Sequence, residues 1–177
     1  SNLVQSGMSS VLGLDEARLQ QVCEEISQDD SYVKIANLLC PGNIAISGHV
    51  SALELAEPAC TSAGAMKTVR LQVAGAFHTE LMRPAVDTLA AALEEVRFQA
   101  TRVPVYSNVD ARPHASPDEF PGLLAQQVVT PVRWEESLRG MLENGTTEVL
   151  EIGTGRVLAG TLKRIHRKLP CSNFGDS

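Results

Sequence analysis

The sequence has few aromatic residues and few cysteines, and both shortages argue against whole classes of function. Aromatic side chains make up 4% of the 177 residues, which leaves little for the stacking platforms of single-stranded nucleic-acid binders. No Cys-x-x-Cys spacing suggests a metal site or a redox motif. We therefore expect buried free thiols in a reducing compartment at the four cysteines, which are Cys23, Cys40, Cys60 and Cys171.

Positive charge and long apolar runs are also lacking. The formal net charge is −6, whereas binding to phosphates requires a basic surface. No apolar stretch approaches the roughly 20 residues that cross a bilayer, and no signal segment opens the sequence. The sequence thus predicts a soluble, cytoplasmic protein with no nucleic acid and no membrane among its partners. Gly153 and Gly155 lack the third glycine of a G-x-G-x-x-G motif, so no dinucleotide cofactor is expected either.

The first seventy residues alternate short strands and helices. Apolar spacing predicts strands over 6–14, 31–39, 43–49 and 67–75 and a helix over 15–27, with Pro41-Gly42 as a turn. Ser51 and Glu54 have the spacing of a capping box that starts a second helix, which Pro58 should kink or end. The resulting order, βαββαβ, predicts a ferredoxin-like subdomain.

The second half has longer units, in the order helix, strand, helix, helix, strand, helix. We expect a buried strand over 101–108, a helix after a capping box formed by Ser116 and Glu119, and a helix over about 134–144 that ends at Gly145. Two or three strands for four helices are too few for a covered parallel sheet, which suggests the latter part of a larger α/β fold. We divide the chain into 6–72, 73–170 and a tail, 171–177.

His78 is the candidate catalytic residue, in the stretch "VAGAFHTELMRPA". An imidazole takes and returns protons near neutral pH, and the loops between strands and helices often carry functional groups. The spacing alone leaves open an ordinary structural histidine. No window reads G-x-S-x-G, so the usual serine nucleophile is missing, and Cys40 fits a buried thiol better than a nucleophile.

Several further motifs occur in a fixed order along the chain. They are "GAFHTELMRPA", "VPVYSNVDA", "LLAQQVVTPVRWEESL" and "EIGTGRVLAGTLKRI", preceded by "SGMSSVLGLDE" and "NLLCPGNIAISGH". Together they closely resemble the malonyl-CoA:acyl carrier protein transacylase family and the related acyltransferase domains of polyketide synthases. The resemblance implies an α/β protein: a ferredoxin-like βαββαβ subdomain plus the C-terminal part of an α/β-hydrolase-like acyltransferase domain.

The resemblance also implies an activity. It is transfer of malonyl from malonyl-CoA to the phosphopantetheine thiol of acyl carrier protein through an acyl-serine, in fatty-acid or polyketide biosynthesis. By resemblance, His78 is the general base and acid, a backbone carbonyl at Gln127 orients it, Phe77 favours malonyl over bulkier units, and Asn37 faces the cleft. The family's serine precedes the segment that resembles residue 1, so the chain alone is expected to be inactive. The alternative is an inactive fragment that serves as a carrier-protein or small-molecule binding module.

The end of the last predicted helix carries a run of basic residues on an otherwise acidic protein. They could steer an acidic carrier protein, or they could be a solvated helix end favoured by the helix dipole. The pattern does not decide between these two interpretations. The residues are Lys163, Arg164, His166, Arg167 and Lys168.

Overall fold

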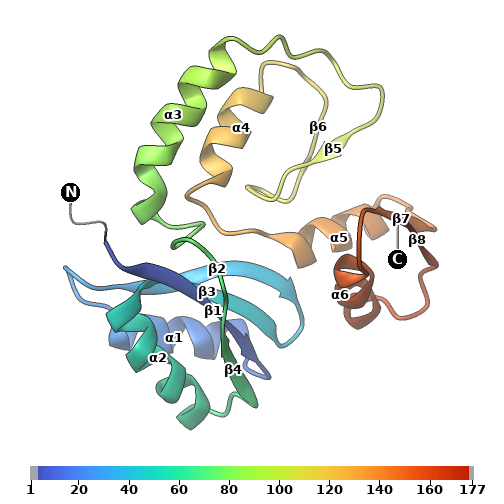
Figure 1. The fold of residues 1–177 in the computed structure, drawn as a ribbon. Coiled ribbons are helices and arrows are strands. Elements are labelled where there is room, and N and C mark those ends of the chain that lie inside the picture. The colour runs from blue at the N-terminus through green and yellow to red at the C-terminus, as the bar shows by residue number, and fades with distance from the viewer. Residues whose placement is uncertain (1–3, 176–177) are drawn as a thin grey trace.

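The computed structural model describes residues 4–175 and begins with a four-stranded antiparallel sheet (Figure 1). The elements of this part are β1 (Ser6–Leu12), α1 (Glu16–Ile26), β2 (Val33–Cys40), β3 (Asn43–His49), α2 (Val50–Ser62) and β4 (Lys67–Arg70). The strand order is β2-β3-β1-β4, and all three pairs are antiparallel. The predicted ferredoxin-like βαββαβ subdomain is therefore confirmed, although β4 ends at Arg70 rather than at residue 75.

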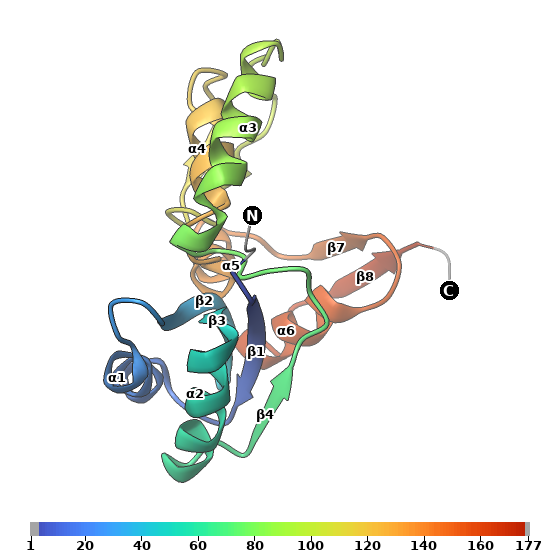
Figure 2. The same ribbon diagram turned by 60° about the vertical axis from the view of Figure 1, so that its left-hand side comes forward.

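Helices α1 and α2 cover one face of this sheet (Figure 2). Leu19, Val22 and Cys23 recur at helical spacing along α1 and are buried against the sheet. From the sheet side, Ile46 joins the same core, and Leu53 enters it from α2. Helix α1 thus buries the apolar face that its own sequence periodicity provides, and the sheet and α2 complete the same core.

The expected capping box of α2 is wrong, and so is the expected end of the helix at Pro58. The helix begins at Val50, directly after β3, so Ser51 is already inside it and its hydroxyl pairs with that of Ser31 at 2.7 Å instead of forming a capping box. Pro58 does not end the helix, because α2 runs on to Ser62. Buried residues on both sides of the proline, among them Leu53 and Cys60, hold the helix to the sheet and outweigh the lost backbone hydrogen bond.

The second part of the chain contains more helix than sheet. Its elements are η1 (Glu80–Met82), α3 (Arg83–Glu94), β5 (Val105–Tyr106), β6 (Pro113–His114), α4 (Phe120–Gln127), α5 (Trp134–Glu143), β7 (Val149–Ile152), α6 (Val157–Ile165) and β8 (Cys171–Phe174). Helices α3 and α4 pack side by side, while α5 and α6 lie against β2 of the subdomain (Figure 1). Strands β7 and β8 are parallel, and β5 and β6 form a short antiparallel hairpin.

Three expectations about this part need correction. The strand expected to be buried over 101–108 is reduced to two residues in a hairpin, with Val103 68% and Val105 44% exposed. The chain at 171–174 is no tail, because it forms β8 beside β7. Cys171 lies on that strand and is only partly covered, whereas the other three cysteines are buried, and all four are free thiols as expected. Within 4–175, no helix is long and apolar enough to span a membrane.

Candidate functional site

The loop that carries His78 connects the small subdomain to η1 and is held at both ends. The Ala76 amide donates to the Ser6 hydroxyl at 3.2 Å, and the buried Thr79 hydroxyl donates to the Ala76 carbonyl at 2.8 Å. The Thr79 hydroxyl also accepts from the Leu81 amide and thereby caps η1. His78 lies between these contacts with φ of +64°, a backbone conformation that costs energy for any residue with a Cβ.

The imidazole of His78 is fixed by main-chain oxygens. Its Nδ1 lies 2.9 Å from the Gln127 carbonyl and 3.1 Å from the Thr130 carbonyl. Because carbonyl oxygens only accept, Nδ1 must carry the proton, and in the neutral ring Nε2 then keeps its lone pair. The Gln127 side-chain nitrogen is 3.5 Å from Nδ1, but it is a donor and cannot accept the proton that the two carbonyls receive. A half-buried ring in this tautomer can accept a proton at Nε2.

These oxygens are available because α4 ends at Gln127. The last carbonyls of a helix have no partner within the helix and must bond elsewhere. The Val128 carbonyl accepts from the His78 backbone amide at 3.1 Å, so three acceptors from the segment 127–130 surround one histidine. The sequence drew attention to Gln127 but not to Val128 or Thr130, since no local pattern shows which carbonyls a distant ring will meet.

The other two predicted site residues are Phe77 and Asn37. Phe77 precedes the histidine in the same loop and is 38% exposed. Asn37 is half-buried in β2, opposite Val132, which follows Thr130 by two residues. The structure therefore brings His78 and Gln127 into direct contact, and Phe77 is the neighbour of His78 in the sequence. Asn37 is connected to the segment that holds His78 through the backbone at Val132.

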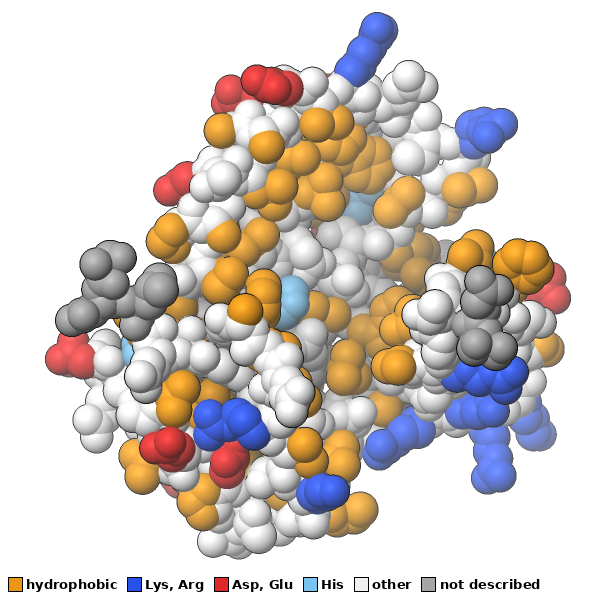
Figure 3. Space-filling model, in the orientation of Figure 1, with side chains coloured by type: hydrophobic (Ala, Val, Ile, Leu, Met, Phe, Trp, Pro, Cys, Tyr) orange, Lys and Arg blue, Asp and Glu red, His pale blue; other side chains and the backbone are white. Residues whose placement is uncertain are grey.

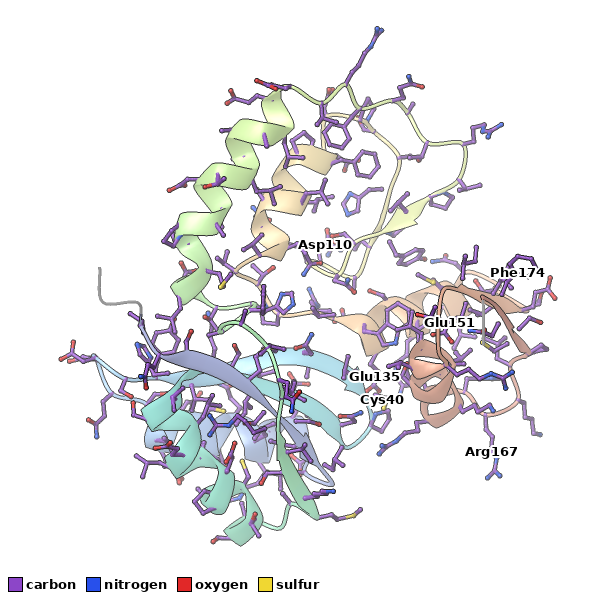
Figure 4. The ribbon with its side chains drawn as sticks, in the orientation of Figure 1. Cys40, Asp110, Glu135, Glu151, Arg167 and Phe174 are labelled. Atoms are coloured by element: carbon purple, nitrogen blue, oxygen red, sulfur yellow. The ribbon has the colours of Figure 1, made fainter. Side chains whose placement is uncertain are left out.

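Cys40 has the properties of a structural thiol. It is buried at the end of β2, where Figure 4 shows it close to Glu135 of α5. Burial raises the pKa of Cys40, and the nearby Glu135 carboxylate acts in the same direction against the guanidinium of Arg164. A thiol that holds its proton is a poor nucleophile, which agrees with the interpretation of Cys40 as a buried thiol.

His114 belongs to a small polar network. Its Nδ1 lies 2.9 Å from a Glu119 carboxylate oxygen and its Nε2 lies 3.1 Å from Asp110, so both ring nitrogens face acceptors. Hydrogen bonding to Glu119 and then to Asp110 raises the pKa of His114 and favours the imidazolium form. The ring joins the β5–β6 hairpin to α4 beside a cavity of about 210 Å³ that Gln127 also lines. Among residues 4–175, no cluster of His, Cys, Asp and Glu side chains could hold a metal ion.

The chain has relatives among known proteins. No protein-family model matches the chain. Curated transacylases match it at 38% identity: that of Bacillus subtilis over 97% of this chain and 54% of its own length, and that of Escherichia coli K12 over 96% and 54%. The chain therefore spans about half the length of the curated relatives that it matches.

Solved structures agree over the whole chain. A malonyl-transacylase in complex with the acyl-carrier protein of a type II polyketide synthase superposes with a TM-score of 0.94 at 36% identity, covering 100% of this chain and 57% of that one. An acyl-carrier-protein S-malonyltransferase from Bartonella henselae gives 0.93 at 34% identity, with 100% and 56% covered.

Fold and comparisons together define the class: a ferredoxin-like subdomain joined to part of an α/β acyltransferase domain. The chain is a homologue of the malonyl CoA-acyl carrier protein transacylases, over about half of their length. The resemblance predicted from the sequence motifs is thus confirmed.

Proposed function

We propose that this chain supplies the proton-transferring histidine of a malonyl-CoA:acyl carrier protein malonyltransferase. The observation that carries the proposal is the double acceptance of the His78 Nδ1 proton by the Gln127 and Thr130 carbonyls. This arrangement fixes one tautomer, orients Nε2 and stabilises the imidazolium that forms when Nε2 takes a proton. The serine nucleophile would come from polypeptide outside these 177 residues, since none of their windows reads G-x-S-x-G.

Two half-reactions follow from this geometry. In the first, Nε2 of His78 accepts the serine hydroxyl proton as the serine oxygen bonds to the malonyl thioester carbon. The carbon–sulfur bond breaks, and the proton passes to the sulfur of coenzyme A. In the second, Nε2 takes the proton of the phosphopantetheine thiol, the sulfur attacks the ester carbon, and the released serine oxygen regains the proton. Each half-reaction returns the histidine to its starting state.

Phe77 and Asn37 would contribute to the acyl site. Phe77 is adjacent to the base in the chain, and a ring at this position would restrict the space for branched acyl groups. Asn37 offers an amide on the strand that contacts Val132, at the side of the subdomain that faces the second half of the chain. We assign both residues to substrate binding and neither to proton transfer.

The carrier protein would be attracted by the basic end of α6. The chain carries five Lys and Arg residues and no acidic residue over 152–175, although its overall charge is −6. Figure 3 shows blue side chains gathered on that side of the molecule, and Figure 4 shows Arg167 pointing away from it. Such a patch raises the association rate with an acidic partner by electrostatic steering. Charge neutralisation at Lys163 and Arg167 should therefore raise KM for carrier protein more than it changes kcat.

The proposal is tested by restoring the rest of the domain. The chain is fused to the part of the Bacillus subtilis transacylase that it does not match, and radiolabelled malonyl transfer to holo carrier protein is measured. We expect turnover by the fusion and none by the 177-residue chain. His78→Ala in the fusion should lower the rate by about 10²- to 10⁴-fold, the usual contribution of a general base.

His49→Ala is the matched control, because this histidine at the end of β3 is also half-buried and its ring contacts Tyr32 rather than a residue assigned to the site. A fusion that unfolds in one cooperative transition but has no transferase activity would contradict the proposal. Equal rates for the fusion and its His78→Ala variant would remove the histidine from the mechanism and leave the chain as a binding module.

A further inference from the structure

The outer edge of β2 pairs with a single residue, Val132, which closely follows the segment 127–130. The Val132 amide donates to the Ala36 carbonyl at 2.8 Å, and the Val132 carbonyl accepts from the Leu38 amide at 2.8 Å. These two hydrogen bonds form a parallel bridge between Val132 and Asn37, so Val132 acts as a one-residue fifth strand of the sheet. We call this contact the Val132 bridge.

The Val132 bridge is directly connected to the oxygen that holds the imidazole. Thr130, whose carbonyl lies 3.1 Å from His78 Nδ1, precedes Val132 by two residues. Pro131 stands between them, and its ring fixes its own φ and restricts Thr130 to extended conformations. Because Pro131 limits the backbone conformations between them, the hydrogen bonds at Val132 set the position of the Thr130 carbonyl.

Strand β2 is irregular at the place where it receives Val132. Its register against β3 shifts between Ile35 and Asn37 and again between Leu38 and Cys40. Such bulges re-aim backbone groups, and they are over-represented next to active sites. Here they flank Asn37 and Leu38, two residues of β2 that take part in the Val132 bridge.

From these contacts we propose that the Val132 bridge is a positioning element for His78. The small subdomain orients the imidazole through the backbone of Leu38, Val132 and Thr130, although none of these residues reacts. The catalytic use of the ring rests on the proposed function. The test below reads the ring geometry in the 177-residue chain, so a failure of transferase activity and a failure of this inference are separate outcomes.

Leu38→Pro removes the amide that donates to Val132 and leaves the pairing with β3 in place. An edge strand tolerates proline where the lost N–H faces away from the sheet. Leu38→Ala is the matched control, because it loses the same side-chain packing and keeps the amide. Val132→Pro and Val132→Ala form a second pair that leaves β2 unaltered and removes the other hydrogen bond of the bridge.

The readout is the Nδ1 proton of His78 in the ¹⁵N-labelled chain, identified by its absence in His78→Ala. We expect this proton to exchange with water about tenfold faster in each proline variant than in its alanine control, the factor associated with one lost hydrogen bond. The ring ¹⁵N shifts should also show a mixture of tautomers in the proline variants only. A purely structural role for the bridge would lower stability without changing the tautomer.

Equal exchange rates and equal ring shifts within both pairs of folded variants would overturn the inference. Circular dichroism establishes folding. Should Leu38→Pro fail to fold, the Val132 pair decides by the same criterion, because Val132 lies between α4 and α5 and its substitution leaves β2 and both helices unaltered.

Discussion

The small subdomain has a continuous hydrophobic core, whereas the second region leaves many of its apolar side chains exposed. Strands β1 to β3 and helices α1 and α2 share one continuous core, in which Ile46 and Leu53 are fully buried. In α3 and α4 no residue is buried, and on β7 Leu150 is 55% and Ile152 78% exposed. Figure 3 shows hydrophobic side chains spread over the face formed by the second region.

Polar contacts hold much of the second region together. The indole of Trp134 donates to the Thr161 hydroxyl at 2.8 Å and connects α5 to α6. The Glu151 carboxylate accepts from the amides of Leu158 and Ala159, at the start of α6. Burial is non-directional, while these contacts depend on geometry. The comparison teaches that hydrophobic packing stabilises the small subdomain and that specific hydrogen bonds shape the region that orients the histidine.

The largest effect should come from the core. Leu53→Ala should lower the free energy of unfolding by about 2–5 kcal/mol, because it leaves a cavity beneath the sheet. Leu150→Ala removes an exposed side chain of the same size and should change stability by less than about 0.5 kcal/mol. Urea titrations followed by circular dichroism measure both. Similar losses of unfolding free energy in the two variants would show that the two regions are packed alike.

A substitution where the two regions meet should change selectivity rather than stability. Phe77→Ser in the fusion with the Bacillus subtilis part should raise the ratio of kcat/KM for methylmalonyl-CoA to that for malonyl-CoA about tenfold, because the proposed function places the ring where it would limit space beside the acyl group. Phe174→Ser, on exposed β8, is the control and should leave the ratio unchanged. An unchanged ratio in Phe77→Ser would place the ring outside the acyl site.

The second region should respond to pH through the polar contacts of His114. Its pKa is raised by Glu119 and Asp110, so its stabilisation is complete below about pH 6.5 and is lost as pH rises through the raised folded-state pKa. The pKa values of the two carboxyls are lowered, chiefly by hydrogen bonding to His114 against an opposing effect of burial, so their contribution is lost in acid.

We therefore expect thermal melts to show the largest gap between the wild-type chain and His114→Gln from about pH 4.5 to 6.5, closing on both sides. NMR titration of the His114 ring measures its pKa directly. A gap that stays the same size below about pH 4.5 and above the raised pKa of His114 would mean that packing, rather than charge, accounts for the contribution of His114.

The smallest expected effect is local to α6. Hydrogen bonds from the Ala159 and Leu158 amides lower the pKa of Glu151 despite some burial, so its charged form caps the helix at neutral pH. Glu151→Gln should speed amide hydrogen exchange in α6 at pH 7, and the difference should shrink as acid protonates the wild-type carboxyl. The exposed Glu148→Gln is the control. Equal exchange in the two variants would remove the capping role.

The sequence by itself was sufficient for elements whose signals are local. The spacing of Leu19, Val22 and Cys23 predicted α1, Pro41-Gly42 predicted the turn between β2 and β3, and Gly145 predicted the end of α5. These features depend on residues a few positions apart, where periodicity and backbone preference act directly. For His78, local spacing left a structural histidine open, and the resemblance of its motif to the transacylase family made it the candidate base.

Only the tertiary structure decided how that base is held. The carbonyls that receive its proton lie 49 and 52 residues away in sequence, and the Val132 bridge joins β2 to a segment nearly a hundred residues later. Likewise, the burial expected for 101–108 was wrong because burial depends on neighbours that periodicity does not name. Hydrogen bonds to backbone oxygens carry no residue-type signature, so the sequence indicated which histidine to examine and the fold determined its geometry.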